Sequence, residues 1–474
     1  MKSTFYSHAL GLLGLSEVAF AVAAAASSSS VKINAGAKLQ HVDGFGFSQA
    51  FTRAGQFQAA DTAIQKQALD LLFSKESGAG FSIIRNWIPS SFDYTIEPNS
   101  PGSASAPPQY RWDGWDEGQL WFTKQAVSYG VKTIYADAWS APGFMKTSGS
   151  EATAGYLCGT PGHDCATGDW RQAYADYLVQ YVKFYGNEGL HITHLGFLNE
   201  PDFRASYSQM QISPNASEAI SFIPVLHKTV DTAKLDVSIT CCDATGWDKQ
   251  SSYTDALVAA GMEHDLGVIT AHMYSSDATY PLNTSLPTWL SEAGVGTSVG
   301  GFVPTWYNTG ALNEGLSWAS KIAKGFVDAG LSAYLYWEGF EIAQQQSASH
   351  LLDTTGTNNT VVLQSGIFHA FSMWSRFVRP GAHRVDTSGG SNLANVTTAA
   401  FQNQDKSVVV IFTNTGSADQ PTDLVVPDHK AGSSAKAWLT DNTHKVEQTS
   451  VGRVRGDSIQ VTIPAHSVVT VKFP

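Results

Sequence analysis

Two glutamates stand where short apolar segments of the chain end. Glu200 follows the run 192–199, "ITHLGFLN", and Glu292 closes the run 286–292, "LPTWLSE". A carboxylate at the end of a buried strand is costly unless it is paired or used in chemistry. A single glutamate in such a place usually forms a salt bridge or caps a helix. Two glutamates at matching strand ends favour a catalytic pair instead.

Two carboxyl groups that face each other can cleave a glycosidic bond. One protonates the leaving oxygen while the other attacks the anomeric carbon. A separation of about 5 Å gives retention, and a wider gap that admits water gives inversion. The acid needs a raised pKa, and the nucleophile must stay ionised. This chemistry requires no metal, and the sequence has no HExxH motif or Asp-rich loop, so we expect neither a metal nor a cofactor.

The elements that must position this pair form a repeating pattern. Eight short runs rich in β-branched and aromatic residues predict strands at 41–48, 81–88, 132–139, 192–199, 236–242, 266–274, 286–292 and 332–338. Helical segments separate most of them, with candidates at 61–75, 171–185, 313–329 and 365–378. Alternating strands and helices predict a parallel sheet, and eight such units favour a closed (β/α)8 TIM barrel.

In such a barrel, catalytic groups lie at the C-terminal ends of the strands. Glu200 follows the fourth predicted strand and Glu292 ends the seventh, so the two side chains would point across the barrel mouth. An open doubly wound sheet is the alternative fold. Its phosphate-binding fingerprint is incomplete, because "GFGFSQA" at 44–50 has only two of the glycines.

The last part of the chain changes character. Strand-like runs follow one another with no helices between them, at 407–412, 421–426, 436–440, 458–463 and 467–473. Ile459, Val461 and Ile463 alternate with polar residues, as in a half-buried antiparallel strand. We therefore predict a catalytic barrel over 41–385. A fused β-sandwich side domain would be built from 386–474 and the N-terminal strand 31–40.

The N-terminus has the features of a secretory signal peptide, which we place at 1–25. Lys2 supplies the positive start, and residues 9–24 are mostly apolar, although Ser16 and Glu17 interrupt them. This run is too short for a good membrane span.

The composition of the whole chain limits its ligands. A formal net charge of −12 argues against nucleic acid, and 13 Trp, 17 Tyr and 24 Phe suit a neutral, stackable ligand. We expect a secreted, extracellular monomer that binds neither nucleic acid nor membrane.

Cysteines and sequons agree with secretion. Cys158 and Cys165 flank a short loop that a disulfide could close, whereas Cys241 and Cys242 are adjacent and need a rare vicinal bridge or other partners. A zinc site is disfavoured because no CxxC pair is present. Sequons that could carry glycans begin at Asn215, Asn283, Asn358 and Asn395.

Six motifs together resemble glycoside hydrolase family 30. They are "DGFGFSQAF" at 43–51, "WSAPGFMK" at 139–146, "FLNEPDF" at 197–203, "AHMY" at 271–274, "WLSEAG" at 289–294 and "YLYWEGFE" at 334–341. The resemblance extends over nearly the whole mature chain and implies a retaining barrel glycosidase with a side domain built from both termini. It assigns the acid/base to Glu200 and the nucleophile to Glu292.

The resemblance also implies which residues surround the sugar. Asn199 would bind the sugar 2-hydroxyl, and Arg85 would neighbour the nucleophile. Aromatic rings at or near strand ends could stack on pyranose faces, and they are Trp87, Trp139, Tyr274 and Trp337. For the first two, filling the core is an equally good interpretation. We assign no chemistry to His272.

Two loops indicate which polysaccharide is the substrate. The segment 48–57 resembles the fungal xylan-cleaving branch of the family, in which an arginine at the position of Arg53 holds the glucuronic acid of glucuronoxylan. A solvated surface arginine is the other interpretation. The long loop 90–114 could wall off the non-reducing side of the cleft, where Asn99 would bind a terminal xylose by similarity.

These observations leave three functions open. The leading prediction is a retaining enzyme that cleaves β-1,4-xylosidic bonds in xylan or glucuronoxylan, both internally and by release of xylobiose. An endo-β-1,6-galactanase or β-1,6-glucanase of the same family is the first alternative. A non-catalytic carbohydrate-binding barrel is the second, and the presence of both glutamates counts against it.

Overall fold

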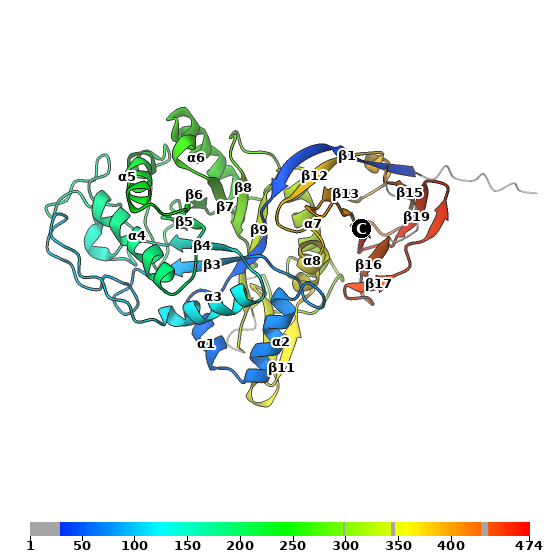
Figure 1. Cartoon of the computed structure of the whole chain (residues 1–474), viewed down its shortest axis with the longest axis horizontal. Coiled ribbons are helices and arrows are strands. Elements are labelled where there is room, and N and C mark those ends of the chain that lie inside the picture. Colours follow the sequence, from blue (N-terminus) through cyan, green and yellow to red (C-terminus); the bar gives the residue numbers. More distant parts are fainter. Residues whose placement is uncertain (1–28, 297–298, 343–346, 428–434) are drawn as a thin grey trace, which may run out of the picture.

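Two sheets organise the chain (Figure 1). The computed structural model describes residues 29–296, 299–342, 347–427 and 435–474. The predicted signal peptide, 1–25, lies outside the described residues.

The first sheet closes into an eight-stranded parallel barrel. Its strands are β2 (Gly44–Ser48), β3 (Ile83–Ile88), β4 (Thr133–Ala138), β5 (His194–Gly196), β6 (Ser238–Ala244), β7 (Val268–His272), β8 (Thr288–Glu292) and β9 (Ala333–Phe340). They pair in chain order, and β9 pairs in parallel with both β8 and β2, which closes the ring. The hairpin of β10 (His350–Thr355) and β11 (Val361–Gln364) extends this sheet from β9. The predicted TIM barrel is confirmed.

Helices surround the barrel. They are α1 (Arg53–Ala59), α2 (Thr62–Phe73), α3 (Gln119–Ser128), α4 (Arg171–Asn187), α5 (Ser217–Ala233), α6 (Trp247–Ala259), α7 (Gly315–Val327) and α8 (Gly366–Ser375). The four helical candidates correspond to α2, α4, α7 and α8. On α4, the residues Tyr174, Leu178, Tyr181 and Tyr185 are fully buried, because they recur at the helical period and so lie on one face of the helix.

The second sheet curls into the side domain. It contains β1 (Ser29–Val42), β12 (Ala382–Ser388), β13 (Val396–Gln402), β14 (Val408–Asn414), β15 (Gln420–Val425), β16 (Lys436–Thr440), β17 (Glu447–Thr449), β18 (Arg453–Arg455), β19 (Ser458–Ile463) and β20 (Ser467–Phe473). The N-terminal strand β1 pairs with β12 and β15, as expected of a domain built from both termini. Ile459, Val461 and Ile463 are buried in its core.

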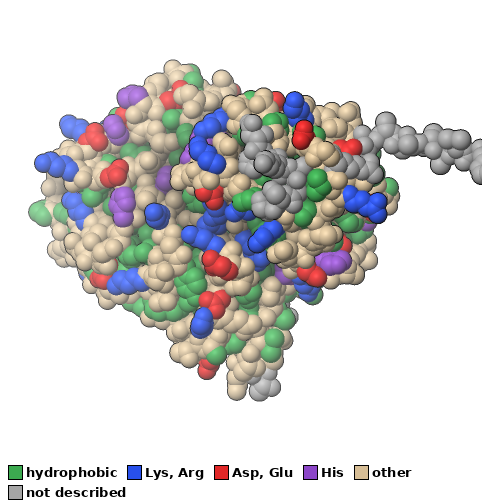
Figure 2. All heavy atoms as spheres, turned by 45° about the vertical axis from the view of Figure 1, so that its right-hand side comes forward, with side chains coloured by type: hydrophobic (Ala, Val, Ile, Leu, Met, Phe, Trp, Pro, Cys, Tyr) green, Lys and Arg blue, Asp and Glu red, His purple; other side chains and the backbone are tan. Residues whose placement is uncertain are grey.

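The long β1 ends where the barrel begins, so this strand connects the two sheets (Figure 1). On the face drawn in Figure 2, basic and acidic side chains are scattered among uncharged ones. Among the described residues, no helix is long and apolar enough to cross a membrane.

Candidate active site

A cleft of about 450 Å³ opens where the barrel strands end. Its lining combines carboxyl, amide and aromatic side chains: Phe51, Trp139, Asn199, Glu200, Phe203, Tyr207, Thr245, Tyr274, Ser275, Glu292 and Trp337. Glu200 follows β5 and Glu292 ends β8, so the barrel brings both predicted catalytic residues to one cleft.

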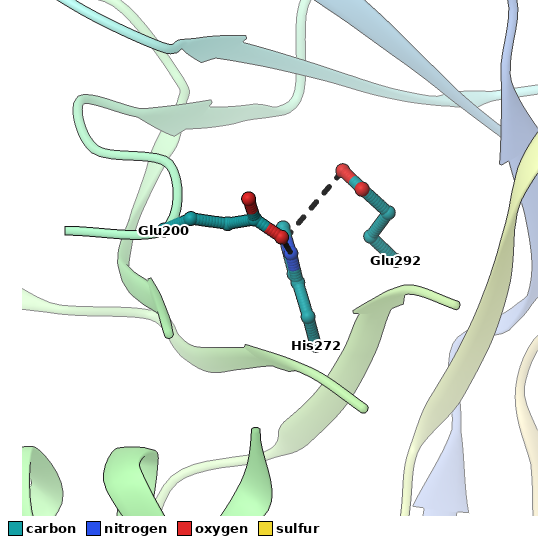
Figure 3. Close-up of side chains that lie close together, drawn as sticks. All are labelled: Glu200, His272 and Glu292. Atoms are coloured by element: carbon teal, nitrogen blue, oxygen red, sulfur yellow. Dashed lines mark hydrogen bonds and ion pairs between the residues drawn. The ribbon is translucent and has the colours of Figure 1, made fainter. Parts of the chain in front are cut away.

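The two carboxyl groups are close to each other. One ligand atom from each of Glu200, His272 and Glu292 lies within 4.8 Å of the other two, and His272 stands between the glutamates (Figure 3). Carboxyl groups about 5 Å apart suit a nucleophile and an acid/base, whereas a gap that holds water needs about 6.5–9.5 Å. The arrangement therefore fits double displacement with retention.

Glu292 is held by a permanent cation and a phenol. Arg85 Nη1 donates to Glu292 Oε2, and Tyr274 OH donates to Oε1 over 2.8 Å. Arg85 is buried, and its Nη2 also donates to Asp137 Oδ2 and to Asn199 Oδ1, both over 2.7 Å. The second contact fixes the Asn199 amide with its NH2 group available for a sugar hydroxyl. Arg85 thus orients Glu292 and Asn199 together.

Glu200 has a titratable neighbour instead. His272 Nδ1 donates to Oε1 over 3.1 Å, and Tyr207 OH donates to Oε2 over 3.0 Å. Burial alone would raise the pKa of Glu200, but the hydrogen bond and positive charge of His272 outweigh it and lower this pKa. The sequence analysis predicted that the pKa of the acid is raised. In this structure the pKa of the Glu200 side chain is lowered instead.

His272 is positioned as an imidazolium. Burial opposes its charge, but Glu292 together with hydrogen bonds to Asp243 and Glu200 raises its pKa to about 10. A protonated ring has no lone pair for a metal. The cluster of Glu200, His272 and Glu292, which has the spacing of a metal site, can also pass a proton between neighbouring side chains.

Two buried aspartates complete the network, and the sequence analysis missed both. Asp137 on β4 pairs with Arg85, and Asp243 on β6 contacts His272 Nε2 over 3.2 Å. Both stand near strand ends, as Glu200 and Glu292 do, so the rule that found the glutamates could have found these residues. Sequence reasoning also missed the cleft residues Phe51, Phe203 and Tyr207, which lie on loops without a periodic pattern.

Aromatic rings form part of the lining of the cleft. Trp139, Tyr274 and Trp337 line it, as predicted for sugar platforms, and the rings of Trp139 and Trp337 are 6.1 Å apart. Trp87 is buried and does not line the cleft, but it packs against Phe51 with ring centroids 4.7 Å apart. Its position supports the core-filling interpretation.

The two loop residues are placed differently from the predicted contacts. Arg53 Nε forms an ion pair with the buried Glu338 and contacts His350 Nε2 over 3.2 Å, and Arg53 is not among the cleft-lining residues. Asn99 is exposed and also absent from the cleft lining. The loop that carries it packs along α4, where Thr95 Oγ1 lies 2.9 Å from Tyr177 OH.

The cysteines form two disulfides, Cys158–Cys165 and Cys241–Cys242. The sequon residues Asn215, Asn283, Asn358 and Asn395 are all exposed.

Comparisons with known proteins identify the family. Residues 102–262 match "O-Glycosyl hydrolase family 30", and residues 381–471 match "Glycosyl hydrolase family 30 beta sandwich domain". The catalytic domain of GH30 xylanase C from Talaromyces cellulolyticus is 43% identical, with a TM-score of 0.88 over 94% of this chain and 100% of that chain.

More distant relatives differ in their named activities. Glucuronoxylanase XynC of Bacillus subtilis is 21% identical over 94% of this chain and 92% of its own length. Endo-1,6-beta-D-glucanase neg1 of Aspergillus fumigatus is 24% identical over 79% of each. The barrel, the side domain and the 43% identity lead to one conclusion: the chain belongs to glycoside hydrolase family 30.

Proposed function

We propose that this protein is a secreted retaining xylanase that cleaves β-1,4-xylosidic bonds by double displacement. The observation that carries the mechanism is the close approach of Glu200 and Glu292 in one cleft. The choice of xylan is supported by the 43% identity to a xylanase over nearly the whole chain.

In the first step, Glu292 attacks the anomeric carbon while Glu200 protonates the leaving oxygen. Arg85 and Tyr274 hold the attacking carboxylate in place, and the NH2 group of Asn199 donates to the sugar 2-hydroxyl. In the second step, Glu200 removes a proton from water, which hydrolyses the glycosyl-enzyme ester. Trp139 and Trp337 supply stacking surface for the sugar rings.

The test is a product profile on unbranched β-1,4-xylan, glucuronoxylan, β-1,6-glucan and β-1,6-galactan, with Glu292→Gln as the inactive control. We expect xylo-oligosaccharides whose newly formed reducing ends initially have the β configuration. Cleavage of only a β-1,6-linked glycan would overturn the xylanase proposal and would agree with the relative named as a 1,6-glucanase. Initial release of α-anomers would overturn retention. Release of xylobiose alone would show an exo mode.

The proposal extends to the glucuronic acid branch through Arg53. Its polar contacts to Glu338, His350 and the Phe51 backbone use Nε and Nη1, and it lies two residues from Phe51 in the cleft. Because Glu338 already pairs with it, we expect Arg53→Ala to lower kcat/KM on glucuronoxylan by only about tenfold, with little change on linear xylan. Equal losses on both substrates would remove this assignment.

Secretion and a monomeric state are also part of the proposal. Two disulfides and four exposed sequons suit an extracellular protein. N-terminal sequencing of protein from the culture medium and sedimentation equilibrium test these two points.

A further inference from the structure

Asp243 is linked to the acid/base residue in two ways. It lies near the end of β6, directly after the disulfide-bonded pair Cys241–Cys242, and it is buried. Its backbone carbonyl accepts a hydrogen bond from the Glu200 backbone N–H over 2.8 Å. Both residues have positive φ angles, 53° for Asp243 and 47° for Glu200. Such backbone is uncommon outside glycine and tends to occur at functional sites.

The Asp243 side chain forms the second link. Its Oδ1 lies 3.2 Å from His272 Nε2, and the other ring nitrogen, Nδ1, lies 3.1 Å from Glu200 Oε1. A continuous chain of hydrogen bonds therefore runs from Asp243 through the imidazole to the acid/base. All three residues are buried, so bulk water does not interrupt it.

Neutral donors stabilise Asp243 as an anion. Tyr135 OH donates to Oδ2 over 2.6 Å, Thr270 Oγ1 donates to Oδ2 over 2.7 Å, and Ser291 Oγ donates to Oδ1. Burial would raise the pKa of Asp243, but the hydrogen bond from His272 and the charge of Arg85, 3.7 Å away, lower it to about 2.

The charged groups around His272 are mainly anionic. Asp243 on β6 and Glu200 after β5 each contact one ring nitrogen, and Glu292 on β8 lies 3.7 Å from Nε2. The Tyr274 ring on the loop after β7 packs edge-on against the imidazole, and Arg85 on β3 is the opposing cation near Asp243. The imidazole therefore has an anion at each nitrogen.

We propose that Asp243 is a positioning residue that retains one proton on the His272–Glu200 pair. Glu200 can then draw this proton from His272 and give it to the leaving oxygen. The proton passes along the hydrogen bond from Nδ1 to the Glu200 carboxylate: the N–H bond breaks, an O–H bond forms, and the ring becomes neutral. Glu200 then gives this proton to the leaving oxygen. In the second step the proton that Glu200 takes from water returns to Nδ1. The inference rests on the proposed function only in that Glu200 acts on a glycoside.

The test compares Asp243→Asn with the wild type through the pH dependence of kcat/KM, which reports ionisations of the free enzyme. Loss of the Asp243 charge weakens proton binding by the pair. We therefore expect the alkaline limb of the profile to move at least one pH unit lower in the variant. Thr270→Val is the matched control, because it removes a neutral donor to Asp243 and leaves the charge. We expect it to keep the wild-type limb.

A second measurement separates proton supply from packing. An aryl glycoside with a very acidic phenol leaves without protonation, so its kcat/KM should be nearly unchanged in Asp243→Asn at pH 8. On the polysaccharide, kcat/KM should fall by about tenfold for each pH unit above the limb of the variant, up to the roughly 10²–10⁴-fold that general acid catalysis contributes. Equal losses on both substrates, or the same limb shift in Thr270→Val, would overturn the proposal.

The wild type provides a test that needs no variant. The ¹⁵N chemical shifts of the His272 ring should be those of an imidazolium at pH 8, where exposed histidines are neutral. A neutral ring beside an ionised Glu200 carboxylate at pH 8 would overturn the inference. If the wild type does not cleave xylan, the xylanase proposal fails separately. The Asp243 experiment is then run on whichever glycan the enzyme hydrolyses, because its readout is a ratio to wild type.

Discussion

The two halves of the proposed catalytic site hold their carboxyl groups with different kinds of cation. On the nucleophile side, Glu292 contacts Arg85, whose guanidinium stays charged over the working pH range of a protein. On the acid/base side, Glu200 contacts His272, whose charge depends on Asp243. A nucleophile needs only a fixed anion, whereas an acid/base must lose and regain a proton. The difference between the two cations matches the difference between the two roles.

The largest effect is expected for Glu292→Gln. The variant cannot form the glycosyl-enzyme ester, so kcat should fall by roughly 10⁴–10⁶-fold on every substrate, the scale seen when a covalent group is removed. Rates on xylan and on an activated aryl glycoside check this. Turnover that is unchanged on either substrate would show that the whole site is wrongly assigned.

Glu200→Gln should separate the two halves. General acid catalysis contributes about 10²–10⁴-fold, so kcat/KM on xylan should fall by this factor. For an aryl glycoside with an acidic phenol, kcat/KM should change little, because the leaving group needs no proton. Added azide should then restore turnover by attacking the glycosyl-enzyme without a base. A variant that loses both substrates equally would contradict the acid/base role.

The variants Tyr274→Phe and Tyr207→Phe form a matched pair. Each removes one hydroxyl, the first from the Glu292 side of the site and the second from the Glu200 side. The two phenols donate to Glu292 over 2.8 Å and to Glu200 over 3.0 Å. A hydrogen bond to a charged group contributes about 1.5–3 kcal/mol, which is a factor of roughly 10 to 10² in rate.

We expect Tyr274→Phe to lower kcat/KM on all substrates, and Tyr207→Phe to lower it mainly where the leaving group needs protonation. Steady-state kinetics on xylan and an aryl glycoside distinguish the two patterns. The same pattern for both variants would mean that the sides are not functionally distinct.

Much of the fold could be predicted because its elements have clear periodicity. The barrel strands are short apolar runs, and the Tyr174–Tyr185 face of α4 follows the helical period. Strands β12, "AHRVDTS", and β13, "VTTAAFQ", escaped prediction because they are partly polar or rich in alanine. Pairing makes them strands: β12 pairs with β1, which lies far away in sequence, and β13 pairs with β14, which follows it.

The sequence could predict those site residues whose carboxyl groups follow a strand. Glu200 and Glu292 were visible for that reason. The sequence could not predict residues whose charge depends on contacts with distant parts of the chain. The charge of His272 depends on Asp243 on β6 and on Glu200 in the loop after β5, so no local pattern reveals it. Arg53 shows the same limit: the fold pairs it with the buried Glu338, a contact that its position in the chain did not reveal.

The smallest expected effect is on stability, and it again contrasts Arg85 with His272. The pKa of His272 is raised from 6.5 to about 10 in the folded protein. Its stabilisation is therefore fully present below pH 6.5 and is lost as the pH rises toward 10. Between these values the folded state holds the extra proton, so the free energy of unfolding should fall by about 1.4 kcal/mol per pH unit. Arg85 does not titrate in this window and should contribute no slope.

Other groups titrate in the same range, so the measurement must be a difference. The pKa of Lys146 is lowered to about 8 by burial, and burial raises those of Asp116 and Glu117 to about 7 and about 8. These groups remain in His272→Gln. Between pH 7 and 9, the Tm of the wild type should therefore fall by about 1–2 °C per pH unit more than the Tm of this variant. Parallel Tm curves would show that the ring is neutral, and the contrast between the two cations would then disappear.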